Sequence, residues 1–272
     1  MREIHVSTEA IRIMRAIYFF LLASASLCTL HFVPLCQIEP LPFVETISEG
    51  MTRACEFVSV RHQDNAPQLE LKLPGAPEHF TWGTQMRYTI NVSDPKDGES
   101  RYGEIDARAC LLEIEYIPAQ NKTEMDERIK RSLRKPEHTG LSLMKRSTCF
   151  GCHADKTRLA GPSFEEISGK YENNSDIAAK LGQNIIDGSS GIWGDQMMPS
   201  HPDLTIGEAT QIADYILEQG GNKNRWIYPG LEGSFRTIEK PATHDHGVYL
   251  LTASYTSTSN IRGEQSVVFK IK

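Results

Sequence analysis

The spacing of apolar residues changes twice along the chain, and this change constrains the fold more than any other feature. From Cys55 to Ile117 the apolar residues come in short alternating runs that are typical of β-strands. Residues 119–220 change to the helical spacing of three and four, and residues 233–272 return to strand-like runs. The pattern predicts a multidomain protein with an all-α region between two β regions.

Turn residues between the runs define the β regions in more detail. Four runs separated by turn segments favour an N-terminal β-sandwich domain over residues 50–118. In one of them Met86, Tyr88, Ile90 and Val92 alternate with polar residues, as in a half-buried strand. The C-terminal β segment, 231–272, is too small to be stable alone. We expect it to pack on the helical region or on the first β domain.

Helix signals divide residues 119–220 into a linker and a domain. Residues 119–136 predict a charged, exposed linker helix that starts at Thr123, with Met125, Ile129 and Leu133 on one stripe. Residues 137–220 predict an all-α domain of several short helices. Their expected starts are Thr139, Ser163 with Glu166 as a capping box, Ser175, and Thr205 with Glu208 as a second capping box.

Residues 1–38 are predicted to direct export. Arg12 and Arg15 precede a charge-free stretch, 16–38, whose apolar first half fits a signal peptide, with a retained membrane anchor as the alternative. Cys28 and Cys36 lack the small preceding residue that lipid attachment requires. We therefore expect the protein to act in the periplasm or on the outer cell surface. The net charge of −6 argues against a nucleic-acid binder.

One motif carries cofactor chemistry. Cys149-Phe-Gly-Cys152-His153 is C-x-x-C-H, the attachment signature of c-type haem. Two thiols on one helical turn can each add to a vinyl group of one porphyrin, and the adjacent histidine can then ligate the iron. A zinc site would need a second ligand pair, and a redox dithiol expects a βαβ setting; neither is present in the sequence pattern. The motif predicts one covalent haem c.

The sixth iron ligand is expected from a glycine-rich loop that ends in Met197-Met198-Pro199. Thioether sulfur favours ferrous iron and raises the reduction potential, which suits an electron carrier. We expect Met198, beside the rigid Pro199, to be the ligand, with Met197 as the main alternative. His201 would instead make a bis-histidine site. The two methionines could also merely pack over the porphyrin.

Together these segments are similar to the small bacterial class I cytochromes c. CFGCH, Gly161-Pro162-Ser163-Phe164, the loop 188–202 and a terminal amphipathic helix carry the resemblance over residues 137–220. It implies that the Pro162 carbonyl accepts the second ring N–H of His153, and that Trp193 lies near a haem propionate. More faintly, residues 80–106 and 247–259 resemble the immunoglobulin-like and strand segments that flank a cytochrome c in exported multidomain carbohydrate dehydrogenases.

Three smaller patterns leave alternatives open. Cys55 and Cys110 could form an intersheet disulfide or remain buried free thiols. The carboxylates of residues 94, 97 and 99 could bind calcium, although a plain turn is the better interpretation. His244 and His246 could bind a metal, but without a third ligand a solvated loop is expected.

These observations predict a monohaem carrier of single electrons, and not an enzyme, because filled axial positions leave no site for substrate. Its expected partners are a dehydrogenase donor and a terminal oxidase or soluble acceptor. Residues 137–220 hold 12 acidic and 6 basic residues, which predicts a basic docking patch on the partner. The alternatives are a haem-based sensor or peroxidase-like protein with a labile sixth ligand, and a carbohydrate-binding module with an accessory haem.

Overall fold

The computed structural model describes residues 55–58, 65–75, 81–241 and 247–270. All of these lie in one compact unit, Thr46–Lys272. The predicted leader, with Cys28 and Cys36, lies outside the described residues, as do His244 and His246. In the described part of the chain, no helix is long and apolar enough to span a membrane.

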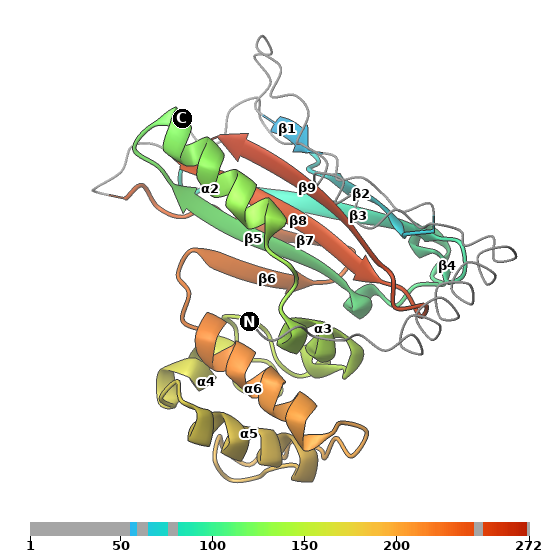
Figure 1. The fold of residues 1–272 in the computed structure, drawn as a ribbon, viewed down its shortest axis with the longest axis vertical. Coiled ribbons are helices and arrows are strands. Elements are labelled where there is room, and N and C mark those ends of the chain that lie inside the picture. The colour runs from blue at the N-terminus through green and yellow to red at the C-terminus, as the bar shows by residue number, and fades with distance from the viewer. Residues whose placement is uncertain (1–54, 59–64, 76–80, 242–246, 271–272) are drawn as a thin grey trace, which may run out of the picture. The chain divides into compact units, whose positions relative to one another are not determined.

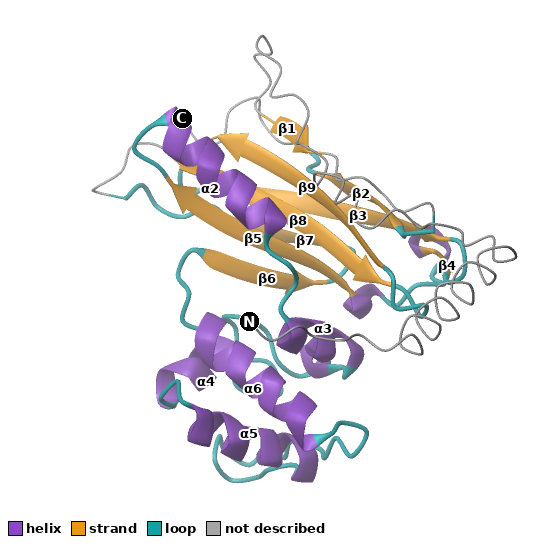
Figure 2. Cartoon of the chain, in the orientation of Figure 1, coloured by secondary structure: helices purple, strands orange, loops and turns teal. Residues whose placement is uncertain are grey.

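Two antiparallel sheets form a β-sandwich (Figures 1 and 2). The first has the order β1-β9-β8-β5-β6, and in the second β3 is paired with β2, β4 and β7. The strands of the first sheet are β1 Cys55–Val58, β5 Cys110–Pro118, β6 Arg225–Pro229, β8 Gly247–Thr256 and β9 Arg262–Lys270. Those of the second are β2 Gln68–Lys72, β3 Gln85–Asp94, β4 Gly98–Glu99 and β7 Glu232–Arg236.

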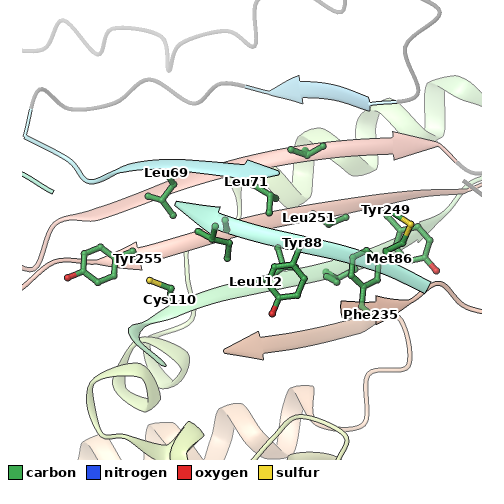
Figure 3. Close-up of a cluster of buried hydrophobic side chains, with 14 of the residues drawn as sticks. Leu69, Leu71, Met86, Tyr88, Cys110, Leu112, Phe235, Tyr249, Leu251 and Tyr255 are labelled. Carbon is green, nitrogen blue, oxygen red and sulfur yellow. The ribbon is translucent and has the colours of Figure 1, made fainter. Parts of the chain in front are cut away.

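The core lies between the two sheets, where alternate residues of each strand point inward (Figure 3). Met86, Tyr88, Ile90 and Val92 of β3 are each at most 3% exposed, which confirms the alternation predicted for this strand. They meet side chains of the first sheet, among them the fully buried Tyr249 of β8. Interdigitation of the two inner faces is what a sandwich core requires.

Strands from before and after the helical region share both sheets. β5 pairs along its whole length with β8, and β3 pairs with β7. The sequence suggested an N-terminal sandwich and a separate C-terminal segment, whereas the two segments build one sandwich around an inserted helical region. Edge strand β6 was not predicted, because five residues that end in Pro229 give little periodic signal.

The first helix, α2 (Lys122–Arg134), covers the outer face of the first sheet. Its stripe of Met125, Ile129 and Leu133 packs on an apolar cluster of β5, β8 and β9. The expectation of an exposed linker helix was therefore wrong for this stripe, since the sheet offers an apolar outer surface that the sequence pattern does not reveal. The helix begins after the N-cap Asn121 and not at Thr123.

Four helices follow and form the inserted region. The expected capping boxes at Ser163–Glu166 and Thr205–Glu208 are both present. The start expected at Ser175 is capped one residue earlier, by Asn174. The helices are α3 Thr139–Arg146, α4 Phe164–Lys170, α5 Ser175–Asp187 and α6 Ile206–Gln219.

Apolar contacts and buried charges join the helical region to the sandwich. Leu111 of β5 and Ile227 of β6 belong to the same apolar cluster as the residues of α3 and α6. The backbone N–H of Ile227 donates to the buried Asp155 carboxylate, with 3.1 Å between nitrogen and oxygen. Arg225 of β6 pairs with Glu113 of β5 and donates to the hydroxyl of Tyr215 on α6.

The sheet order also separates two cysteines. Cys55 on β1 and Cys110 on β5 lie in the same sheet, with β9 and β8 between them. Three strand spacings amount to roughly 14 Å, about twice the limit for a disulfide. Of the two alternatives that the sequence left open, the disulfide is therefore excluded, and Cys110 is a buried free thiol.

Candidate haem site

The C-x-x-C-H motif forms a tight turn directly after α3. Thr148 adopts a left-handed conformation with φ 57°, and a short 3₁₀ helix spans Cys149–Gly151. The backbone N–H of His153 donates to the Cys149 carbonyl at 3.0 Å. Burial raises the pKa of Cys149 to about 11, whereas Cys152 is exposed. One turn of chain thus carries both thiols and the histidine.

The ring of His153 is held on two sides. Its Nδ1 lies 2.7 Å from the carbonyl oxygen of Pro162. Its plane stacks on Phe164, with ring centroids 5.7 Å apart at 21°. Burial lowers the pKa of His153, the Pro162 hydrogen bond opposes this, and nearby His201 lowers it further. The ring is therefore kept neutral, and a donor Nδ1 leaves Nε2 as the atom able to ligate a metal.

Gly161 provides the space that this ring occupies. A Cβ atom at position 161 would lie 2.4 Å from Cε1 of His153, closer than real contacts allow. The glycine has an ordinary negative φ, so its role here is the close approach and not the backbone conformation.

The glycine-rich loop holds Met198 by its backbone. Met198 and Ser189 exchange two hydrogen bonds, of 2.8 and 3.2 Å, in an isolated β-bridge. Gly188 turns the chain there with φ 79°, and a Cβ at this position would lie 2.7 Å from the Met198 carbonyl. Met198 packs partly buried on the helical core, whereas Met197 is 67% exposed.

Trp193, in the same loop, lies close to two cationic side chains. The Lys170 ammonium lies 4.3 Å from the centre of its ring and the Arg158 guanidinium 5.8 Å from it. The Arg158 guanidinium also donates to the Trp193 carbonyl, and Tyr171 meets the indole edge-on. These contacts fix the loop at the rim of the site.

A single cavity of about 210 Å³ connects these parts. Its wall brings together every site residue predicted from the sequence, and apolar side chains of α5 and α6 complete it. The predicted residues are Cys149, Cys152, His153, Pro162, Trp193 and Met198. Two thiols, a neutral imidazole and a thioether around one apolar cavity are the donors that a covalently attached haem requires, so the residues present fit this group.

The sequence comparisons point to the same group. The family model for cytochrome c matches residues 138–220. Cytochrome c-551 of Azotobacter vinelandii is 40% identical over 79 residues, which are 29% of this chain and 95% of that protein. The chain belongs to the cytochrome c family. Cytochromes c carry electrons on one covalently attached haem c, and residues 149–153 supply its C-x-x-C-H motif.

Other relatives agree with this assignment. Cytochrome c-552 of Nitrosomonas europaea is 37% identical over 75 residues, 28% of this chain and 73% of that protein. Its crystal structure aligns with 28% of this chain and 95% of its own, at 36% identity and a TM-score of 0.27. The family match over residues 138–220 covers the helical region of this cytochrome c, and the sandwich lies outside it.

The remaining candidates among the described residues do not line the haem cavity of the cytochrome. His201 is not among the residues that line the cavity. The Asp94 carboxylate accepts from the backbone N–H groups of residues 96 and 97, and Asp97 accepts from Tyr255 and Thr258. The turn interpretation of these acids is therefore confirmed. In the described ranges, no three His, Cys, Asp or Glu residues gather as a metal site.

Sequence reasoning missed three kinds of contact in the site. The close approach of Gly161 to His153 was not foreseen, although Gly161-Pro162 stood in the quoted motif. The stacking of Phe164 on His153 and the contacts of Lys170 and Arg158 with Trp193 could not be predicted from residue spacing. They join residues that lie on different elements.

Proposed function

We propose that this cytochrome c carries single electrons outside the cytoplasm, with His153 and Met198 as the axial ligands of its haem iron. Cys149 and Cys152 would anchor the porphyrin through thioether bonds. One observation carries the proposal: both methionines line the cavity that holds His153, but Met198 is partly buried against the helical core, whereas Met197 is 67% exposed.

Each residue has a definite task in this arrangement. When bound, haem c supplies the iron that accepts and releases the electron. Pro162 accepts the Nδ1 proton of His153, which keeps Nε2 directed at the metal and makes it a better donor. The bridge between Ser189 and Met198 fixes the backbone from which the Met198 sulfur would reach the iron. If the protein supplied both iron ligands, no position would remain for a substrate, which favours a carrier over an enzyme.

The location and partners follow from the sequence. The basic and apolar leader, 1–38, supports export to the periplasm or outer surface. A dehydrogenase is the proposed donor, and an oxidase or soluble carrier the acceptor. The surplus of acidic residues in 137–220 supports a partner with a basic docking patch.

The ligand assignment is tested by the optical spectrum of the ferric holoprotein. Methionine ligation gives a weak far-red band, which we expect in the wild type and in Met197→Leu but not in Met198→Leu. Met198→His should keep the fold and lower the reduction potential, because nitrogen favours ferric iron relative to a thioether. Loss of the band in Met197→Leu alone would overturn the assignment. High-spin features in the wild type would instead favour a sensor or peroxidase with an open site.

A further inference from the structure

The second half of α2, together with its C-cap residue Lys135, is the most concentrated basic segment of the described chain. Residues 128–135 contain five cations and no acid, while the rest of the chain holds all 35 acidic residues and only 24 of the 29 basic ones. We call these five side chains the α2 basic face. They are Arg128, Lys130, Arg131, Arg134 and Lys135.

The fold directs this face to solvent. Helix α2 lies on the first sheet (Figure 1). Its apolar stripe packs there, so charged residues occupy the opposite side of the helix. Arg128 pairs with Glu124, and Lys130 pairs with Glu127. Arg131, Arg134 and Lys135 are exposed and, among the described residues, have no carboxylate within ion-pair distance.

Helix electrostatics explain only part of this arrangement. Cations in the last turn complement the helix dipole, and one or two are enough for that purpose. Three unpaired cations add mutual repulsion to the folded state, which a bound polyanion would relieve.

The surface chemistry of α2 indicates which polyanion. Protein interfaces need an apolar or aromatic centre, and α2 has none to offer because Met125, Ile129 and Leu133 are packed on the sheet. Adsorption to lipid headgroups needs only clustered Lys and Arg, each worth about 1 kcal/mol near an anionic surface. We propose that the α2 basic face binds anionic phospholipid headgroups.

Such binding would orient the molecule. The helical region 137–220, with 12 acidic and 6 basic residues, is repelled by an anionic bilayer, while α2 is attracted. The haem region would therefore face away from the lipid, toward soluble partners. The proposal rests on α2 alone and stands whether or not the axial ligands are those given above.

The test measures binding of the purified holoprotein to vesicles at low salt. The partition coefficient for phosphatidylglycerol–phosphatidylcholine vesicles is divided by that for pure phosphatidylcholine vesicles. Insertion of the apolar leader contributes to both coefficients, so it cancels in this ratio. The variant Arg131→Gln, Arg134→Gln, Lys135→Gln should reduce this ratio by about 100-fold, from about 1 kcal/mol per cation. The matched control, Lys96→Gln, Lys180→Gln, Lys223→Gln, removes the same charge from exposed sites elsewhere and should leave the ratio within about twofold.

Three outcomes would overturn the proposal. They are no preference of the wild type for anionic vesicles, a loss of binding in the control triple variant equal to that in the α2 variant, and tighter binding of duplex DNA than of the vesicles. A charge-conserving variant, Arg131→Lys with Arg134→Lys, should retain the preference, which separates loss of charge from loss of the helix.

Discussion

The close contact between Gly161 and His153 gives a prediction whose size follows from the structure. In Gly161→Ala the new Cβ would lie 2.4 Å from Cε1 of the imidazole, 2.8 Å from Nδ1 and 2.9 Å from Nε2. Ordinary contacts begin near 3.4 Å, so the ring must shift by about 1 Å. Overpacking of this kind costs roughly 1–3 kcal/mol, and loss of the Pro162 hydrogen bond adds about 1 kcal/mol.

We therefore expect Gly161→Ala to lower the free energy of unfolding by roughly 2–4 kcal/mol and to change the axial-ligand spectrum. Urea unfolding of the holoprotein, followed by tryptophan fluorescence, measures the first effect. Gly169→Ala is the matched control, because its Cβ would meet nothing within 4 Å on the exposed side of α4. Helix propensity should make that variant more stable by about 0.5–1 kcal/mol. If Gly161→Ala unfolds at the wild-type midpoint with an unchanged spectrum, the steric reasoning fails.

Three further outcomes can be checked. Thr148→Gly should raise the free energy of unfolding by about 0.5–1 kcal/mol, since a left-handed threonine with φ 57° is strained and glycine is not; an unchanged urea midpoint would contradict this. Burial raises the pKa of Cys110 to about 12, so about one thiol in a thousand is ionised at pH 9, and iodoacetamide should label it only in urea. Reduction of the haem by a purified dehydrogenase donor should slow as salt rises, because acid-to-base steering is screened; a flat or rising rate would show that the acidic residues are structural.

Local signals were enough to predict much of this protein. The C-x-x-C-H turn, the two capping boxes and the alternation of β3 each involve residues only a few positions apart. Such patterns act through backbone hydrogen bonds and side-chain periodicity, which the order of residues specifies directly. For the same reason the resemblance to class I cytochromes c was clear over the helical region.

Tertiary structure alone decided the features that join distant residues. No local sequence pattern predicts that β5 pairs with β8, which follows the inserted helical region, because strand pairing depends on which apolar faces meet in space. The separation of Cys55 from Cys110, the covering of the sheet by α2 and the contrast between partly buried Met198 and exposed Met197 arise in the same way. Met197 and Met198 have the same side chain, so the sequence cannot say which of them packs on the core. The turn at Gly188 and the bridge to Ser189 set the position of Met198 in the folded chain.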